Sequence, residues 1–141
     1  MFSLVFPGQG SQTIGMGKDF FENYDLVKDL FQQADDSLGA SLSKIILEGP
    51  KDELDLTINT QPAIFLISYS IFQVMKKEFN MDLDNSKYFA GHSLGEYSAL
   101  CAANYLSFSD TIKILKIRGN AMQNAVPKGE GGMLAVLGSK V

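Results

Sequence analysis

The feature that most constrains the fold of this chain is a Gly-x-Ser-x-Gly sequence at residues 91–95, placed between a strand-like run and a helix-like run. Residues 87–90 are typical of a short buried strand, and apolar residues recur at helical spacing after position 95. In this setting Ser93 lies on a sharp turn, where a Cβ on Gly91 or Gly95 would collide with the neighbouring strand or helix. The pattern predicts a nucleophile elbow, and the simpler alternative is a tight strand-to-helix turn without chemistry.

Residues beside and after Ser93 extend this prediction. The amide of Leu94, at the start of the following helix, is expected to point at the space in front of Ser93, where an attacked carbonyl develops negative charge. Glu96 lies in the first helical turn, where a carboxylate favours the helix dipole, so a stabilising role is weighed equally with a catalytic one. Cys101 is expected to pack as a small apolar residue, because nothing near it in the sequence predicts an activated thiolate.

The amino-terminal segment predicts a second loop close to Ser93. Residues 2–6 are apolar and are typical of a short buried strand, which the glycines and proline of residues 7–12 end. In an open α/β sheet, ligands gather beyond the carboxyl ends of the strands, so this loop and Ser93 are expected on the same rim. The glycine spacing does not match a dinucleotide or phosphate-binding loop, and the plain alternative is an ordinary strand-to-helix connection.

Hydrophobic periodicity predicts two shorter and two longer helical segments besides the one after Ser93. A helix is expected over residues 26–38, capped by Asp25 and stopped by Gly39, and a short turn over residues 43–47, capped by Ser43.

The two longer helices are expected to form the centre of the fold. One follows Thr60 with Pro62 in its first turn, and its apolar residues cover so much of its circumference that it is expected to be the central buried helix. The other is opened by the Ser and Asp of residues 107–110 and carries Arg118.

Length and composition indicate a globular domain. The chain has 141 residues, of which 45% are hydrophobic and 20% charged, which allows one domain with a sizeable core. Twelve basic and 16 acidic residues give a net charge of -4 without a basic run, which argues against nucleic acid as a partner. A single cysteine argues against a disulfide framework and favours a reducing cytoplasm. The amino terminus lacks the basic region of a signal peptide, and the apolar stretch at residues 62–75 is too short and too polar to span a membrane.

The order of these segments indicates an α/β fold. Three strands are expected against about five helices, the third strand at residues 133–137 after the glycine-rich connector 129–132. A parallel sheet of this size leaves helix faces and strand edges uncovered, so the sequence is expected to be the front part of a longer fold.

Four motifs follow one another along the chain. They are Phe6-Pro7-Gly8-Gln9-Gly10-Ser11-Gln12, Gln61-Pro62-Ala63, Gly91-His92-Ser93-Leu94-Gly95-Glu96 and Arg118-Gly119. In this order they resemble the malonyl-CoA:acyl carrier protein transacylase family of fatty acid synthesis, and the resemblance spans essentially the whole chain. It implies an incomplete α/β-hydrolase-like large subdomain at residues 1–128, followed at residues 129–141 by the connector and first strand of an inserted ferredoxin-like small subdomain.

The resemblance also implies roles for single residues. Ser93 is the expected acyl-accepting nucleophile, and the amides of Gln9 and Leu94 are expected to form the oxyanion hole. Arg118 is expected to bind the free carboxylate of the malonyl group, because a guanidinium matches a carboxylate bidentately, whereas the residues alone allow a solvent-facing helix position. His92 is expected to line the acyl pocket, and Gln61 either starts a helix or faces the active site.

The implied reaction is a ping-pong acyl transfer. Malonyl-CoA, the substrate, acylates Ser93, CoA leaves, and the phosphopantetheine thiol of acyl carrier protein takes the malonyl group. No metal and no bound cofactor are expected.

One departure from the family concerns the general base. In the family it is a histidine well downstream, whereas this sequence has a single histidine, His92, which lies next to the nucleophile on a tight turn and is poorly placed to take its proton. Two alternatives therefore stay open: a serine hydrolase that uses the same elbow, and a truncated or split subunit that is inactive or only binds acyl carrier protein.

Overall fold

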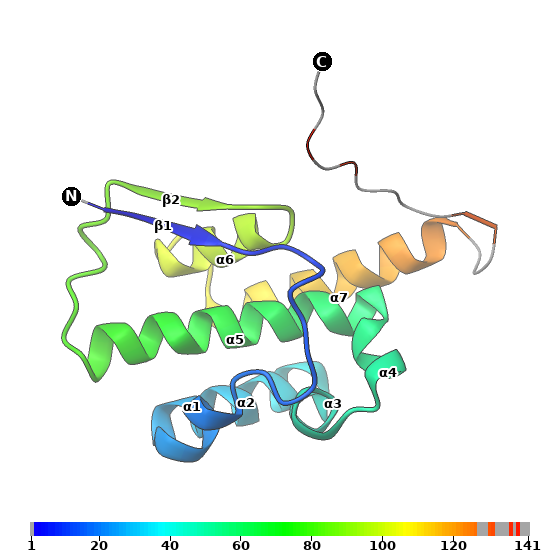
Figure 1. The fold of residues 1–141 in the computed structure, drawn as a ribbon, viewed down its shortest axis with the longest axis horizontal. Coiled ribbons are helices and arrows are strands. Elements are labelled where there is room, and N and C mark those ends of the chain that lie inside the picture. The colour runs from blue at the N-terminus through cyan, green and yellow to red at the C-terminus, as the bar shows by residue number, and fades with distance from the viewer. Residues whose placement is uncertain (1, 127–129, 132–135, 137, 139–141) are drawn as a thin grey trace.

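Two short parallel strands carry the candidate site at their carboxyl ends (Figure 1). The structure is a computed structural model that describes residues 2–126 together with residues 130, 131, 136 and 138. Strand β1 (Ser3–Phe6) pairs with β2 (Tyr88–Gly91) in parallel, with Phe6 opposite Gly91. The loops that follow the two strands therefore start side by side, which confirms the prediction that both lie on one rim of the sheet.

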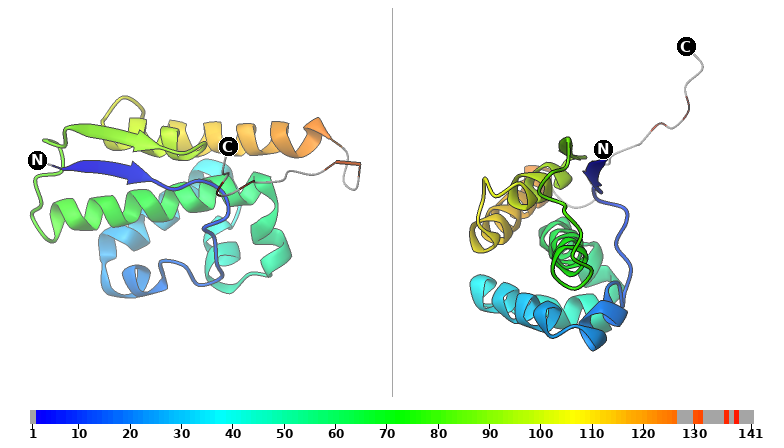
Figure 2. Two further views of the ribbon diagram at one scale, coloured as in Figure 1. Left: turned by 45° about the horizontal axis from the view of Figure 1, so that its top comes forward. Right: turned by 90° about the vertical axis from the view of Figure 1, so that its left-hand side faces the viewer.

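The described residues also form seven helices. They are α1 (Lys18–Asn23), α2 (Asp25–Leu38), α3 (Leu42–Glu48), α4 (Lys51–Asp55), α5 (Thr57–Lys77), α6 (Gly95–Ala102) and α7 (Phe108–Ala125). Helix α5 runs through the middle, with α1 and α2 on one side and the strands, α6 and α7 on the other (Figure 2). None of these helices combines the length and the apolarity needed to cross a membrane.

The hydrophobic core lies on both sides of α5. The larger cluster joins α2, α5 and α7 through fully buried side chains such as Phe31, Phe65 and Leu115. A smaller cluster lies under the strands, where Phe6 packs edge-on against Phe72 of α5. The prediction that the helix around Pro62 is the central buried one is confirmed.

Three predicted helix starts are wrong in detail. Helix α5 begins at Thr57, so Pro62 lies inside it, and the Thr60 hydroxyl donates to the carbonyl oxygen of Leu54 at 2.6 Å instead of capping the helix. Asp25 is the first residue of α2 and forms an ion pair with Lys28.

The third concerns Ser43, which lies inside α3. Its amide and hydroxyl both donate to the Asp35 carboxylate, so a contact between helices replaces the expected cap.

Two other predicted helix ends are confirmed. Gly39 stops α2 in the left-handed conformation, and Ser107 caps α7 by accepting from the Asp110 amide at 3.1 Å. The predicted strand at residues 133–137 falls, apart from residue 136, outside the described residues.

Candidate active site

The turn at Ser93 has the strained geometry that the glycine spacing predicts. Ser93 has a φ of +56°, in the left-handed region of backbone conformation that residues other than glycine rarely adopt. A Cβ on Gly91 would overlap the backbone of Gly95, and a Cβ on Gly95 would overlap the carbonyl oxygen of Phe6 and lie 2.8 Å from that of Pro7. Both glycines are therefore required where the turn passes between β1 and the start of α6, and the steric prediction is confirmed.

The loop after β1 lies directly against this turn. A Cβ on Gly8 would lie 2.9 Å from the carbonyl oxygen of His92, so only a glycine allows the two backbones to approach so closely. Leu94 is fully buried at the start of α6. In the described part of the chain the amides of Gln9 and Leu94 donate no hydrogen bond. The amide that follows Ser93 and one amide of the adjacent loop therefore have no acceptor within the described residues.

Side-chain hydrogen bonds attach this loop to α4 and α5. Gln9 donates through Nε2 to the Thr57 hydroxyl at 3.3 Å. Gln12 donates to the Asp55 carboxylate at 3.0 Å, and its own Oε1 accepts from the Gly10 amide at 2.8 Å. Lys51 and Gln12 together hold the pKa of Asp55 below its ordinary value, so this carboxylate stays ionised as an acceptor. These hydrogen bonds hold the loop after β1 against α4 and the first turn of α5.

A cation lies beside the Ser93 hydroxyl. Arg118 of α7 donates from Nη2 to Ser93 Oγ at 3.1 Å and from Nη1 to Gln61 Oε1 at 2.6 Å. Its guanidinium carbon is 5.7 Å from the centre of the Tyr97 ring. Arg118 is 25 positions from Ser93 and 57 from Gln61, so the packing of three helices brings them together.

A glycine in α7 explains how Arg118 reaches this position. A Cβ on Gly119 would lie 2.7 Å from the Thr57 carbonyl oxygen and 2.8 Å from the Ile58 Cα. Helix α7 therefore approaches the first turn of α5 as closely as a bare backbone permits. The neighbouring Arg118 is thereby placed over Gln61, one turn further along α5.

The family follows from comparison with known proteins, in which residues 3–140 match the acyl transferase domain family. The chain belongs to the acyl transferase domain family. It is 47% identical over 137 residues to the malonyl CoA-acyl carrier protein transacylase of Haemophilus influenzae, an alignment that covers 97% of this chain and 43% of that protein. The chain thus spans less than half the length of this curated relative. The resemblance predicted from four motifs is confirmed.

Solved structures of related proteins share the fold. The acyl-carrier-protein-S-malonyltransferase of Bartonella henselae matches with a TM-score of 0.84 and 49% identity, over 89% of this chain and 40% of that one. A malonyl-transacylase solved in complex with its type II PKS acyl-carrier protein matches with a TM-score of 0.83 and 40% identity, over 91% of this chain and 40% of that one. At these identities the likeness supports comparison of the sites as well as of the folds.

Other candidate residues of this acyl transferase domain form no side-chain hydrogen bond with the Ser93 hydroxyl within the described residues. The His92 side chain is exposed and lies against Gly8, while the His92 amide extends the sheet by donating to the carbonyl oxygen of Phe6 at 3.1 Å. Glu96 is exposed in the first turn of α6. Cys101 is buried, and burial raises the pKa of its thiol, so the prediction that it packs as an apolar residue is confirmed. Within residues 2–126 and the few described beyond them, no group of acidic, histidine or cysteine side chains could hold a metal ion.

Two members of the cluster were not expected from the sequence. Tyr97 contributes only to the helical periodicity after the elbow, and its ring faces the Arg118 guanidinium. The sulfur of Met122 accepts a hydrogen bond from Gln61 Nε2 at 3.1 Å. Met122 lies four positions after Arg118 on α7, a spacing that places both on one helix face and could have signalled the contact.

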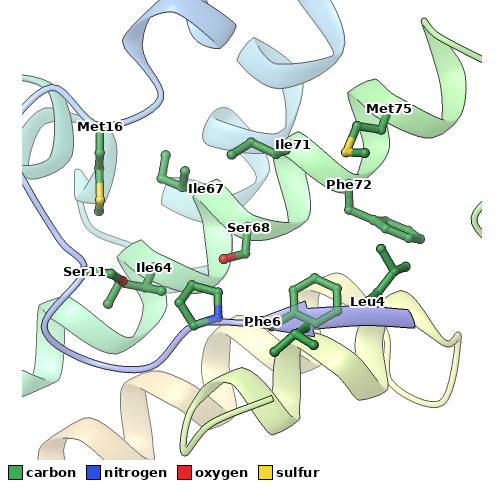
Figure 3. A pocket seen from close by; sticks show the side chains of 12 residues that line it. Leu4, Phe6, Ser11, Met16, Ile64, Ile67, Ser68, Ile71, Phe72 and Met75 are labelled. Carbon is green, nitrogen blue, oxygen red and sulfur yellow. The ribbon is translucent and has the colours of Figure 1, made fainter. Parts of the chain in front are cut away.

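The domain also has an apolar cavity of about 350 Å³ between β1 and α5 (Figure 3). Its walls include Leu4, Phe6, Ile67, Ile71 and Phe72. Ser93, Arg118 and Gln61 do not line it, whereas Pro7 and Ser11 of the loop after β1 do.

Proposed function

We propose that this chain supplies the nucleophile and the carboxylate-binding side of a malonyl-CoA:acyl carrier protein transacylase. The observation that carries the proposal is the 3.1 Å contact between Arg118 Nη2 and Ser93 Oγ. A guanidinium carries only donors and cannot take the serine proton, but it is suited to bind an anionic group on the acyl chain that Ser93 receives.

The chemistry is an acyl transfer in two halves. Ser93 Oγ attacks the thioester carbonyl of malonyl-CoA, the Oγ–C bond forms as the C–S bond breaks, and CoA departs with the serine proton on its sulfur. The phosphopantetheine thiol of acyl carrier protein then attacks the serine ester and regenerates the hydroxyl. The amides of Gln9 and Leu94, which donate no hydrogen bond in the described residues, would stabilise the oxyanion in both halves.

Selection for malonyl over acetyl groups follows from Arg118. The carboxylate of a malonyl ester would replace Ser93 Oγ as the acceptor of the Nη2 donor, and the charge-assisted pair favours the dicarboxylic acyl chain. An acetyl group leaves the guanidinium without an anion. We place the exposed His92 at the rim of the same pocket, because its side chain lies against the Gly8 loop.

The general base is not assigned within this sequence. His92 is its only histidine, and the side chain of His92 lies against Gly8 and forms no hydrogen bond with the Ser93 hydroxyl in the described residues. We therefore propose that the residues of this chain acylate slowly by themselves and that added imidazole, acting as a base, accelerates the reaction.

The finer architecture also belongs to the proposal. We assign residues 1–128 to an α/β-hydrolase-like large subdomain and residues 129–141 to the start of a ferredoxin-like small one. The small parallel sheet, the helices and the solved relatives support the first assignment, whereas most of the second segment lies outside the described residues. A related transacylase was solved with its acyl-carrier protein, which supports acyl carrier protein as the partner. We also propose that the reaction takes place in the cytoplasm.

Transfer to the carrier thiol tests the proposal. The purified chain, malonyl-CoA, imidazole and acyl carrier protein bearing phosphopantetheine are expected to yield malonyl-carrier protein, detected by mass spectrometry. The Ser93→Ala variant provides the matched control and is expected to yield none. Release of malonate without malonylation of the carrier would instead support a serine hydrolase, and no reaction of any kind would support an inactive subunit.

A further inference from the structure

We propose that Gln61 is the positioning residue that sets which donors of Arg118 face the acyl carboxylate, and that malonyl selectivity depends on it. The inference rests on the proposed function, because it assumes that Arg118 binds the malonyl carboxylate. It concerns a residue for which the sequence left open a helix start or a place at the site.

Both ends of the Gln61 amide are held. The residue is 1% exposed, and its Oε1 accepts from Arg118 Nη1 at 2.6 Å. A guanidinium carries only donors, so the carbonyl end of the amide must face it, and the Nε2 end must face the sulfur of Met122, 3.1 Å away. Reversal of the amide would set donors against donors. Gln61 therefore holds the guanidinium in one orientation.

The N–H donors of Arg118 fall into those that Gln61 and Ser93 use and those that remain for a ligand. A guanidinium has five N–H groups. One is used by Gln61 and one by Ser93, while the ring of Tyr97 lies on one side of the group. Within the described residues the remaining donors have no acceptor, so that these donors, together with the one released when Ser93 is acylated, can bind a carboxylate beside Ser93.

For binding of the acyl carboxylate by Arg118, it is as important that Gln61 is uncharged as that it holds the guanidinium in one orientation. A buried amide fixes Arg118 without cancelling its positive charge, so that charge stays available to the acyl carboxylate. A glutamate at the same position would keep the acceptor but form an internal ion pair, which would compete directly with the malonyl carboxylate.

Binding in an acylation-deficient background tests the inference independently of turnover. In the Ser93→Ala chain, the dissociation constants of malonyl-CoA and acetyl-CoA are measured by calorimetry, and the ratio between them is the readout. Loss of a hydrogen bond to a charged group predicts that Gln61→Met lowers the preference for malonyl-CoA about tenfold or more. Gln61→Glu is expected to lower it further, although it retains the size and acceptor of the original side chain.

Gln123→Glu is the matched control. Gln123 lies in the same contact between α5 and α7, where its Oε1 accepts from the Thr57 amide at 3.0 Å, whereas the Arg118 hydrogen bonds in the described residues go to Gln61 and Ser93. This variant is expected to keep the preference for malonyl-CoA. Thermal melting of all variants shows whether they fold, and if Gln61→Met does not fold, the result with Gln61→Glu decides.

The outcomes separate the two proposals. If the Ser93→Ala chain prefers malonyl-CoA and Gln61→Glu leaves that preference unchanged, the positioning role is overturned while the proposed function stands. If the Ser93→Ala chain shows no preference at all, the carboxylate-binding role of Arg118 fails and this inference fails with it.

Discussion

Ser93 shows at the scale of a single residue how two glycines maintain a strained backbone. Its left-handed conformation costs about 1–3 kcal/mol and persists only where the surroundings dictate it. Gly91 and Gly95 provide those surroundings, because each touches backbone where no Cβ has room. The same steric pattern allowed the turn to be predicted from the sequence.

Substitution of Gly95 tests this steric argument. Gly95→Ala is expected to destabilise the fold by about 1–3 kcal/mol or more, because its Cβ would meet backbone oxygens of Phe6 and Pro7. Chemical denaturation measures the change in the free energy of unfolding. Gly39→Ala is the control: that Cβ meets nothing within 4 Å, and only its positive φ costs about 1 kcal/mol. Equal losses for the two variants would contradict the argument.

Substitution of Arg118 tests the origin of acyl selectivity. Arg118→Lys keeps the charge but loses the planar fork, and Arg118→Ala loses both, so the ratio of malonyl to acetyl labelling of Ser93 is expected to fall about tenfold with Lys and further with Ala. Competition between the two CoA esters, followed by mass spectrometry, gives the ratio. Lys113→Ala removes an exposed cation from the same helix and is expected to leave the ratio unchanged. An unaltered ratio in Arg118→Ala would refute the assignment.

The thiol of Cys101 gives a prediction that depends on pH. Burial raises the pKa of Cys101, so in the folded chain less thiolate is present at pH 8 than in an exposed cysteine. Reaction with a thiol reagent at this pH is expected to be at least about tenfold slower than for a Cys101→Ser/Ala121→Cys chain, in which the thiol replaces an exposed residue of α7. Equal rates would show that Cys101 is accessible and ionised.

At the scale of elements, the contact between α5 and α7 assembles the cluster around Ser93. The Gly119 backbone touches the first turn of α5, and this contact sets where Arg118 lies relative to Gln61. The sequence does not predict that Arg118 contacts Gln61 and Ser93, because hydrophobic periodicity identifies the apolar face of each helix but not which faces pack against each other. The resemblance to a family indicated Arg118 but left the place of Gln61 open.

Displacement of α7 is therefore expected to affect stability and selectivity together. Gly119→Ala should push α7 away from Thr57 and Ile58, lower the free energy of unfolding by about 1–3 kcal/mol and reduce the malonyl preference. The control is Asn120→Ala on the exposed side of the same helix, which should change neither quantity appreciably. A loss of stability with full selectivity in Gly119→Ala would show that the contact does not position Arg118.

Local patterns predicted the positions of both described strands, the central helix and the Ser107 cap, because each depends on neighbours in the sequence. The prediction that the two strands are buried is wrong, since Val5 of β1 is 75% exposed and Tyr88 of β2 is 59% exposed. The short helices α1 and α4 were not predicted, since six and five residues provide too little periodicity to detect. The start of α5 was misplaced because Thr60 and Pro62 resemble helix-start signals. In the fold, Thr60 bonds back to Leu54 and α5 gains an additional turn before Pro62.

At the scale of the whole molecule, the site combines parts that the sequence separates widely. The elbow, the Gln9 loop and α7 meet at the carboxyl ends of two parallel strands, where ligands are expected in open α/β sheets. The proposed nucleophile Ser93 lies beside the cation of Arg118, while the only histidine of the sequence lies against Gly8. The account therefore predicts a chain that can be acylated at Ser93 but needs a base to react quickly.

The most direct test is the mass of the chain after incubation with malonyl-CoA, measured with and without imidazole and followed by mapping of the modified peptide. The account predicts one malonyl group on Ser93, formed faster with imidazole and absent from Ser93→Ala. A malonyl group on another residue, or an adduct that persists in Ser93→Ala, would contradict the central claim that the elbow serine is the acyl acceptor.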